Sequence, residues 1–292
     1  MNYNIELRHL KYFNILAEEL HFRKAAEKLF ISQPGLSRQI KLMEEEMGII
    51  LLNRDKKKVT LTRAGEYFKE EVQYILNHLQ HVIRQVQSIQ SGDLGELRIG
   101  FVGSAMQEVI PEILLSLNKK YPKINTSLHE LSNEQQIDDI IHDKLDVGFV
   151  RKKRVPDGIY IQPMMEESFC LVLPSDHDIN EKNFTDVSQL KDDNFILFDK
   201  AYSPEYFNIV MSIFEDQGFV PHITHKSVHA GTIFKLVENG MGMAIVPSSL
   251  KKGFNMDVKY IELNSIPQRT TLYLIRKHGN RNPAMKHLLE LV

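Results

Sequence analysis

The stretch AAEKLFISQPGLSRQIKLMEEEMG, residues 25–48, has the pattern of two helices joined by a very short turn. Four apolar residues recur in the second segment at spacings of four, three and four, so they share one helix face: Leu36, Ile40, Met43 and Met47. Ser32 is placed to cap this helix, and Pro34 is tolerated in its first turn. A short helix, a tight turn and a second helix with a polar outer face predict a helix-turn-helix.

The outer face of the second helix carries short hydrogen-bond donors and cations. The major groove of DNA accepts one α-helix, and side chains near the N-terminus of that helix reach the base edges. A helical surface motif without any ligand is the alternative interpretation. We predict that DNA contacts come from Arg23, Ser32, Gln33, Pro34, Ser37, Arg38, Gln39 and Lys41.

The next segment, IILLNRDKKKVTLT over residues 49–62, has two β-prone stretches on either side of a basic tip. This pattern predicts a hairpin, or wing, beside the helix-turn-helix. A run of lysines is often only a solvated loop, but here its position favours contacts with DNA phosphates. The residues that we expect to make these contacts are Arg54, Lys56, Lys57 and Lys58.

A long helix is predicted to follow, with Thr62 as its N-cap. Its apolar residues are spaced alternately by four and three, which is the 3.5-residue repeat of a coiled coil. About 28 residues make a rod of about 40 Å, which can pair two chains and hold two winged domains apart on DNA. The predicted dimer seam consists of Phe68, Val72, Ile75, Leu79, Val82, Val86 and Ile89.

The pattern changes at SGDLGELRIG, residues 91–100, after which short apolar strands alternate with helical segments. Such alternation is typical of an α/β region, for which we expect mostly parallel sheets. The sequence therefore predicts a DNA-binding domain over residues 1–61, a linker helix over 62–92 and an α/β domain over 93–292.

Composition narrows the class of protein. The 292 residues are 42% hydrophobic and 25% charged, and no apolar run approaches the roughly 20 residues that span a membrane. The N-terminus lacks the features of a signal peptide, and the one cysteine cannot form an internal disulfide, so we expect a cytoplasmic protein. The net charge is −2, divided into +3 for residues 1–92 and −5 for the remainder, so any DNA-binding charge is local.

The search for catalytic motifs finds none. The chain contains no G-x-S-x-G, no H-E-x-x-H and no phosphate-binding loop, and its histidines show no convincing metal-ligand spacing. We therefore expect no enzymatic activity, no cofactor and no metal. A solute-binding protein would account for residues 93–292, but it would have no use for residues 1–92. Cys170 lies in an apolar strand pattern and is interpreted as a core residue.

Several segments resemble the LysR-type transcriptional regulators. The matches to the winged helix-turn-helix are LRHLKYF, AAEKLFISQPGLSRQI, EEEMG, LLNR and VTLTRAG, whereas LRIGFVGS, LDVGFVR, LVLPSDH and GMGMAIVP resemble the effector-binding domain. The effector-binding segments are most similar to those of members that respond to aromatic-acid catabolites. Two departures stand out: Gly35 occupies a position where the family usually has Ala, Ser or Thr, and LLNR replaces the commoner LFER.

The resemblance implies an architecture and an assembly. The effector-binding domain would have a periplasmic-binding-protein-like fold of two α/β subdomains, about 93–162 with 268–292 and about 163–267, joined by two crossover strands. The chain would dimerise through the linker helix, form a homotetramer and bind double-stranded DNA at an operator with an interrupted dyad.

Three places in the α/β region could bind a ligand. Ser104 lies at a predicted helix start, as do Ser132 and Asn133, although each serine could equally be a simple helix cap. Arg151 directly follows the strand DVGFV, where open α/β sheets bind ligands. The resemblance supports these positions and adds Phe198, Tyr202 and Thr232. Two helix N-termini and a guanidinium predict a pocket for a small anion, with a carboxylate as the leading candidate.

Overall fold

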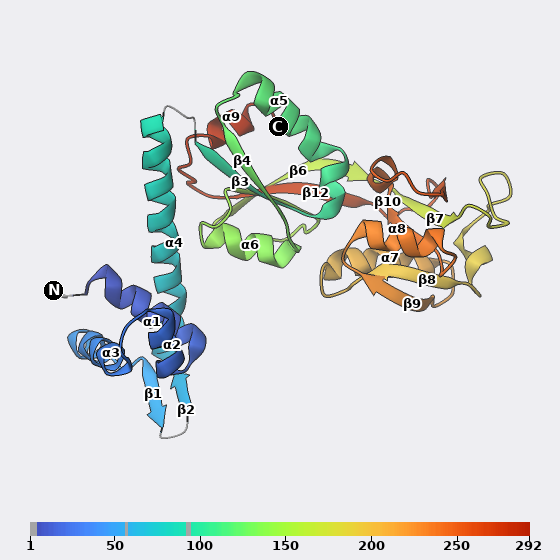
Figure 1. Cartoon of the computed structure of the whole chain (residues 1–292). Helices are drawn as coiled ribbons and strands as arrows, with labels where there is room; N and C mark the ends of the chain where they lie inside the picture. The colour runs from blue at the N-terminus through green and yellow to red at the C-terminus, as the bar shows by residue number, and fades with distance from the viewer. Residues whose placement is uncertain (1–4, 56–57, 92–94) are drawn as a thin grey trace. The chain divides into compact units, whose positions relative to one another are not determined.

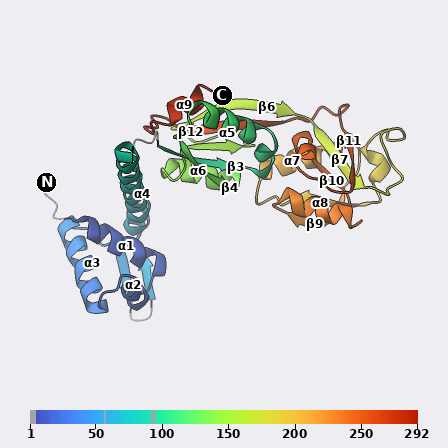
Figure 2. The ribbon, with the colours of Figure 1, turned by 45° about the horizontal axis from the view of Figure 1, so that its top comes forward.

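The computed structural model describes residues 5–55, 58–91 and 95–292 (Figures 1 and 2) and divides into two compact units, residues 1–86 and 87–292. The first unit has the predicted winged helix-turn-helix, in which Ser32 caps the second helix of the motif and Gly48, with a φ of 66°, ends it. Its core is built on Phe13, Leu36 and Ile40, which are fully buried. The elements are α1 (Leu7–Glu19), α2 (Phe22–Lys28), α3 (Gln33–Met47), β1 (Leu52–Asp55) and β2 (Lys58–Leu61).

The long helix α4 (Arg63–Ser91) begins where predicted. Thr62 Oγ1 accepts a hydrogen bond from the Gly65 N–H at 3.0 Å and donates one to the Ile50 carbonyl at 2.9 Å. The start of α4 is therefore bonded to the segment between α3 and β1. A Cβ atom on Gly65 would lie 2.0 Å from the Leu51 carbonyl oxygen, so this close approach requires glycine.

The predicted dimer seam is corrected at its N-terminal end. Val72 is fully buried in the core of its own winged domain, and the Phe68 ring packs against Phe13 with centroids 5.0 Å apart. Phe68 and Val72 follow the same heptad pattern as the rest of the predicted seam, but this part of the helix face packs against the chain's own domain. Among the other predicted seam residues, Leu79 is half-buried, whereas Ile75, Val82 and Val86 are exposed. Ile89 lies on α4, but its side chain is outside those that the structure describes.

The second unit contains two subdomains. The first is a five-stranded sheet in the order β4-β3-β5-β12-β6, with α5 and α9 packed on one face and α6 on the other (Figure 1). Its elements are β3 (Glu96–Phe101), the 3-10 helix η1 (Gly103–Gln107), α5 (Val109–Lys120), β4 (Asn125–Glu130), α6 (Asn133–Ile141), β5 (Val147–Val150), β6 (Ile159–Glu167), β12 (Thr270–Lys277) and α9 (Met285–Leu289).

The second subdomain has two small sheets and two separate hydrophobic clusters. In one sheet β7 lies between β10 and β11, and in the other β8 pairs with β9. The elements are β7 (Phe169–Pro174), η2 (Val187–Leu190), β8 (Asn194–Phe198), α7 (Pro204–Asp216), β9 (His222–Ser227), α8 (Ala230–Glu238), β10 (Ala244–Pro247), η3 (Ser248–Lys252) and β11 (Val258–Glu262).

The expectation of mostly parallel sheets is wrong. β3 is parallel to β4 and β5, and β8 is parallel to β9, but β12 runs antiparallel to β5 and β6, and β7 runs antiparallel to β10 and β11. The antiparallel pairs in the first sheet arise because the chain leaves this subdomain along β6 and returns along β12. All of β6 belongs to the five-stranded sheet, so the passage into the second subdomain follows Glu167 rather than residue 162.

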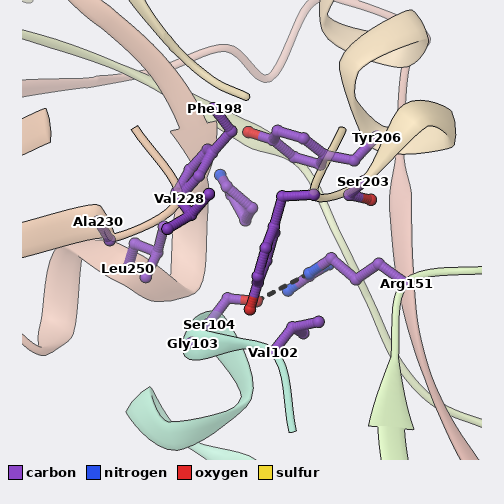
Figure 3. A pocket seen from close by; sticks show the side chains of 12 residues that line it. Val102, Gly103, Ser104, Arg151, Phe198, Ser203, Tyr206, Val228, Ala230 and Leu250 are labelled. Atoms are coloured by element: carbon purple, nitrogen blue, oxygen red, sulfur yellow. Dashed lines mark hydrogen bonds between the residues drawn. The ribbon is translucent and has the colours of Figure 1, made fainter. Parts of the chain in front are cut away.

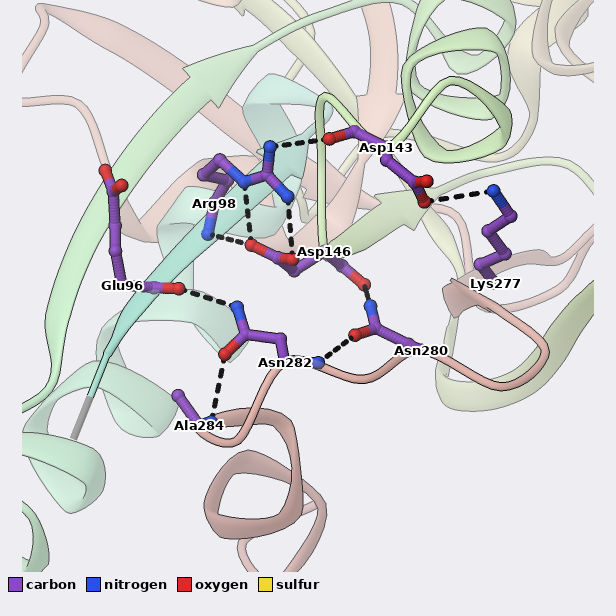
Figure 4. A network of polar contacts seen from close by, with 8 residues as sticks. All are labelled: Glu96, Arg98, Asp143, Asp146, Lys277, Asn280, Asn282 and Ala284. Carbon is purple, nitrogen blue, oxygen red and sulfur yellow. Dashed lines mark hydrogen bonds and ion pairs between the residues drawn. The ribbon is translucent and has the colours of Figure 1, made fainter. Parts of the chain in front are cut away.

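A buried polar network joins three segments at one end of the five-stranded sheet (Figure 4). The Arg98 guanidinium donates from Nε and Nη2 to the two Asp146 oxygens at 2.9 Å each, and from Nη1 to the Asp143 carbonyl at 2.6 Å. Asn280 donates to the Asp146 carbonyl at 3.0 Å, and Asn282 donates to the Glu96 carbonyl at 2.7 Å. The network fixes the starts of β3 and β5 against the segment that leads into α9. No helix in the described part of the chain is long and apolar enough to cross a membrane.

Candidate functional sites

A pocket lies between the two subdomains of the second unit, with about 440 Å³ of empty space when the part open to solvent is counted (Figure 3). Most of its walls are apolar or aromatic. The first subdomain contributes Val102, Gly103, Ser104 and Arg151. The second contributes Phe198, Tyr202, Ser203, Tyr206, Val228, Ala230, Pro247 and Leu250. Ser104, Arg151, Phe198 and Tyr202, predicted from separate stretches of sequence, therefore line one cavity.

Each of the three nitrogens of the Arg151 guanidinium contacts another group of the protein. Nε donates to Ser104 Oγ at 2.8 Å, Nη1 donates to Thr270 Oγ1 at 3.1 Å, and Nη2 forms an ion pair with Glu167. Its side chain is only 5% exposed. The predicted excess of positive charge in the pocket is therefore wrong, because an internal carboxylate already balances this guanidinium.

Glu167 was not predicted from the sequence, although it sets the charge of the site. It ends β6, and its two oxygens also accept hydrogen bonds from the Ser249 N–H at 2.6 Å and the Ser249 hydroxyl at 3.0 Å. Ser249 belongs to η3 in the second subdomain, so Glu167 links Arg151 to the far wall of the cleft. The strand pattern of IYIQPMMEE indicates that Glu167 ends a strand, but only the fold brings it to Arg151.

The two predicted helix starts differ from expectation. Ser104 lies in the short 3-10 helix η1, and α5 begins only at Val109, so Ser104 has no α-helix N-terminus beside it. Ser132 is the N-cap of α6, accepting from the Gln135 N–H at 3.2 Å, and it does not line the pocket. The geometry therefore favours the interpretation of Ser132 as a simple helix cap.

Asn133 and Thr232 also lie outside the pocket walls. Asn133 is 2% exposed: its amide nitrogen donates to Ser203 Oγ at 2.9 Å, and its carbonyl oxygen accepts from the Arg151 N–H at 3.0 Å. It therefore bonds one subdomain to the other. Thr232 lies on α8, whose Ala230 reaches the pocket instead.

Two tyrosines form much of the wall on the side of the second subdomain. Tyr202 donates its hydroxyl to the Leu131 carbonyl at 3.1 Å, across the cleft, and Tyr206 donates to the Ile245 carbonyl at 3.3 Å. Burial, with a smaller effect of Glu130, raises the pKa of Tyr202 to about 12, and burial also raises the pKa of Tyr206. Both phenols are therefore neutral near pH 7, and the pocket offers them chiefly as aromatic surface.

The other candidate surface is the outer face of α3. Ser32, Gln33, Pro34, Arg38 and Lys41 are exposed there, and Ser37 is half-buried. Ser32 Oγ accepts from the Gly35 N–H at 3.2 Å, and a Cβ on residue 35 would lie 2.9 Å from that oxygen. Glycine at this position therefore leaves room for the cap. Two exposed ion pairs flank the face, Arg23 with Glu27 at 3.1 Å and Lys41 with Glu45 at 3.5 Å, and such pairs are weak enough to exchange for phosphate.

Gln39 and Arg54 are held differently from expectation. Gln39 Oε1 is hydrogen-bonded to His9 Nε2 at 2.8 Å, because Gln39 lies on the flank of α3 that faces α1. It is about 200° around the helix from Ser37. Arg54 pairs with Glu44 and lies over the Phe22 ring at 5.4 Å. Lys58 is exposed at the start of β2, whereas Lys56 and Lys57 are outside the described residues.

Comparison with known proteins identifies the family. Residues 90–292 match the family described as LysR substrate binding domain, and residues 7–66 match the bacterial regulatory helix-turn-helix protein, lysR family. This chain belongs to the LysR family. The family members are transcriptional regulators rather than enzymes, so the chain is a DNA-binding regulator with an effector-binding domain.

Individual relatives of this LysR-type regulator match along nearly the whole chain. It is 36% identical over 287 residues to the transcriptional regulator AlsR of Bacillus subtilis, covering 98% of this chain and 95% of the relative. It is 32% identical over 288 residues to CatR of Pseudomonas putida, covering 99% and 98%. Among solved structures, full-length CbnR in complex with its target DNA matches with a TM-score of 0.77 and 25% identity, covering 99% of each chain.

Cys170 is a core residue in this regulator. It is fully buried in β7, and burial raises the pKa of its thiol to about 12. A neutral, inaccessible thiol is a poor nucleophile, so Cys170 is not suited to sensing oxidants. No cluster of metal-ligating side chains occurs among the described residues.

Proposed function

We propose that this regulator binds an operator with an interrupted dyad through α3 and the wing, and that a small effector in the pocket between the subdomains controls its action. The observation that supports this best is the pairing, in one chain, of an exposed donor-rich face on α3 with a pocket lined by both subdomains. The similarity to CbnR, solved with its target DNA, supports the DNA-binding part.

Base recognition is assigned to Ser37 and Arg38, and phosphate contact to Lys58. Replacing Ser37 or Arg38 by Ala should weaken binding to specific DNA by roughly 1–3 kcal/mol each, since base contacts discriminate sequences. Lys58→Ala should weaken binding to all sequences alike, because phosphate contacts carry no sequence information. Gel shifts with DNA upstream of the chain's own gene, compared with random DNA, separate the two effects.

The control for this experiment is Gln39→Ala, because Gln39 is on the same helix but faces α1. It should keep the preference for the upstream DNA. Equal losses on both DNAs for the Ser37 and Arg38 variants would contradict their role in reading bases.

The effector is proposed to be a small carboxylate with an apolar body. The Phe198, Tyr202 and Tyr206 rings supply apolar surface, and the single cation in the pocket wall is Arg151. Because Glu167 already occupies this guanidinium, an incoming carboxylate would take over part of that ion pair. The exchange would also free Glu167 to change its bonds with Ser249, which belongs to the other subdomain. The ligand would then have different affinities for two geometries of the cleft.

Two substitutions test this proposal by thermal shift against a panel of small acids and their neutral amides. Arg151→Met removes the charge and should abolish stabilisation by the acids. Glu167→Gln leaves Arg151 without its carboxylate, so the variant should melt lower and gain more from an acid than the wild type does. Thr232→Ala, outside the pocket walls, is the control and should respond as the wild type.

The anionic part of the proposal fails if amides stabilise the wild type better than the acids do, or if Arg151→Met responds normally. Neither result would affect the DNA-binding part, which the gel shifts measure independently.

A homotetramer is also proposed, built from two kinds of apolar contact. On α4, Ile75, Val82 and Val86 are 45%, 42% and 59% exposed along one stripe that suits a coiled-coil partner. In the second unit, Leu115 on α5 is 72% exposed and Leu128, on the edge strand β4, is 40% exposed. Exposed apolar residues on two separate units offer two independent interfaces between copies of the chain.

A further inference from the structure

Phe30 lies in the turn of the helix-turn-helix, two residues before the Ser32 that caps α3. Its side chain is 95% exposed, more than any other large hydrophobic side chain in the described part of the chain. Its backbone has a φ of 55°, a left-handed conformation that side chains rarely adopt and that glycine adopts without strain. A bulky aromatic residue is thus held in an unfavourable backbone conformation with its ring in water.

The geometry of the turn explains the left-handed backbone of Phe30, but it does not explain why this residue carries a phenyl ring. The Phe30 N–H donates to the Glu27 carbonyl at 3.2 Å, and the Ile31 N–H donates to the Ala26 carbonyl at 3.0 Å. These bonds end α2 and bring the chain to α3, and they require the left-handed residue. Glycine or asparagine would serve this turn better, so the phenyl ring needs another explanation. Residues held in such rarely populated backbone conformations cluster at functional sites.

We propose that Phe30 contacts DNA and that its ring packs on the apolar edge of the duplex beside α3, against a deoxyribose or a thymine methyl group. The inference rests on the proposed function, because it requires α3 to lie in the major groove. Phe30 is only two residues from Ser32, so its Cα lies within about 8 Å of the start of the proposed base-reading face. Its exposed ring would add apolar surface beside that face, and phenylalanine is among the side chains that contact thymine methyls.

The test compares Phe30→Gly with Phe30→Tyr in the full-length protein. Phe30→Gly relieves the backbone strain, so its thermal midpoint should equal or exceed that of the wild type. If the ring contacts DNA, the same variant should bind the DNA upstream of the chain's own gene about tenfold more weakly. Phe30→Tyr keeps the ring and should bind within about twofold of the wild type. Wild-type binding of the Phe30→Gly variant would overturn the inference.

Leu20→Gly provides a matched control. Leu20 ends α1 with a φ of 48° and is 39% exposed, so its substitution also relieves strain and removes an exposed apolar side chain from the same domain. It should leave DNA binding unchanged. An equal loss of binding in Leu20→Gly would assign the effect to a loosened backbone and would overturn the role of the Phe30 ring.

Uracil-substituted DNA distinguishes the two apolar partners. If the ring contacts a thymine methyl, replacing thymine by uracil should weaken the wild type more than it weakens Phe30→Gly. If the ring packs on a deoxyribose, the ratio between the two proteins should be the same on both DNAs. A wild type that does not prefer the upstream DNA over random DNA would refute the proposed function itself, and the inference would fall with it.

Discussion

At the residue scale, two buried arginines mark opposite ends of the same pair of strands. Arg98 lies near the start of β3 and pairs with Asp146, which directly precedes β5, whereas Arg151 directly follows β5. Because β3 and β5 are parallel, their starts meet at the Arg98 network and their ends meet at the pocket (Figures 3 and 4). The first arginine therefore belongs to the anchor of the domain and the second to the wall of the pocket.

Arg98→Met should be strongly destabilising. The Arg98 and Asp146 side chains are 9% and 2% exposed, and the substitution leaves the Asp146 charge buried without its bidentate partner. Loss of one member of a buried pair typically costs about 3–5 kcal/mol. Chemical denaturation followed by circular dichroism measures the change in the free energy of unfolding. Arg8→Met, which breaks an ion pair whose side chains are 57% and 55% exposed, is the control and should cost less than about 1 kcal/mol. Similar losses in both variants would contradict the buried-pair argument.

Local sequence patterns anticipated some of these residues and could not anticipate others. Ser32 and Thr62 were predictable caps because a cap depends only on neighbours along the chain. Glu167 and Ser203 were missed because their partners, Arg151 and Asn133, are 16 and 70 residues away in sequence. Arg151 was correctly placed near the pocket, but its charge state there depends on a carboxylate that no local pattern identifies.

At the element scale, helix periodicity was more informative than strand pattern. The helices α3 and α4 have regular apolar stripes, whereas β4, with the sequence NTSLHE, is an edge strand with mostly exposed residues and no apolar alternation. The α4 repeat also shows the limit of periodicity. It identifies one continuous face but not which part of the face packs within the chain, as Val72 does, and which part is exposed, as Val86 is.

The docking of α4 on the winged domain depends on Gly65. We expect Gly65→Ala to destabilise that domain by about 1–3 kcal/mol, because a Cβ would lie 2.0 Å from the Leu51 carbonyl oxygen and the backbone would have to move. Thermal unfolding measures the loss. Ala64→Gly is a useful comparison, because Ala64 is exposed in the same first turn that buries Gly65 and the substitution should cost only the lower helix propensity of glycine, about 1 kcal/mol. A Gly65→Ala variant as stable as the wild type would show that α4 has room to shift.

At the scale of the whole molecule, the proposed assembly through two separate interfaces predicts how many chains associate in each variant. The stripe on α4 consists of Ile75, Val82 and Val86, and the other apolar surface consists of Leu115 on α5 and Leu128 on β4. They belong to different compact units, so a charge placed in one proposed interface should leave the other intact. Val82→Asp introduces a charge into the proposed coiled-coil seam, and Leu115→Asp introduces one on α5. Desolvating either carboxylate in an apolar contact is costly enough to prevent association there.

Sedimentation of the full-length proteins should therefore give a tetramer for the wild type, a dimer for each single variant and a monomer for the double variant. The two dimers should also differ in function. Leu115→Asp keeps the paired α4 helices and should retain operator binding at one dimer site, whereas Val82→Asp separates the winged domains that must occupy two half-sites together and should lose tight binding. Lys119→Asp is the control, because it places the same charge in the last turn of α5 at a position that is already polar. This variant should remain tetrameric. A tetramer in the double variant would place the interfaces elsewhere, and a monomer in either single variant would show that the two contacts are not independent.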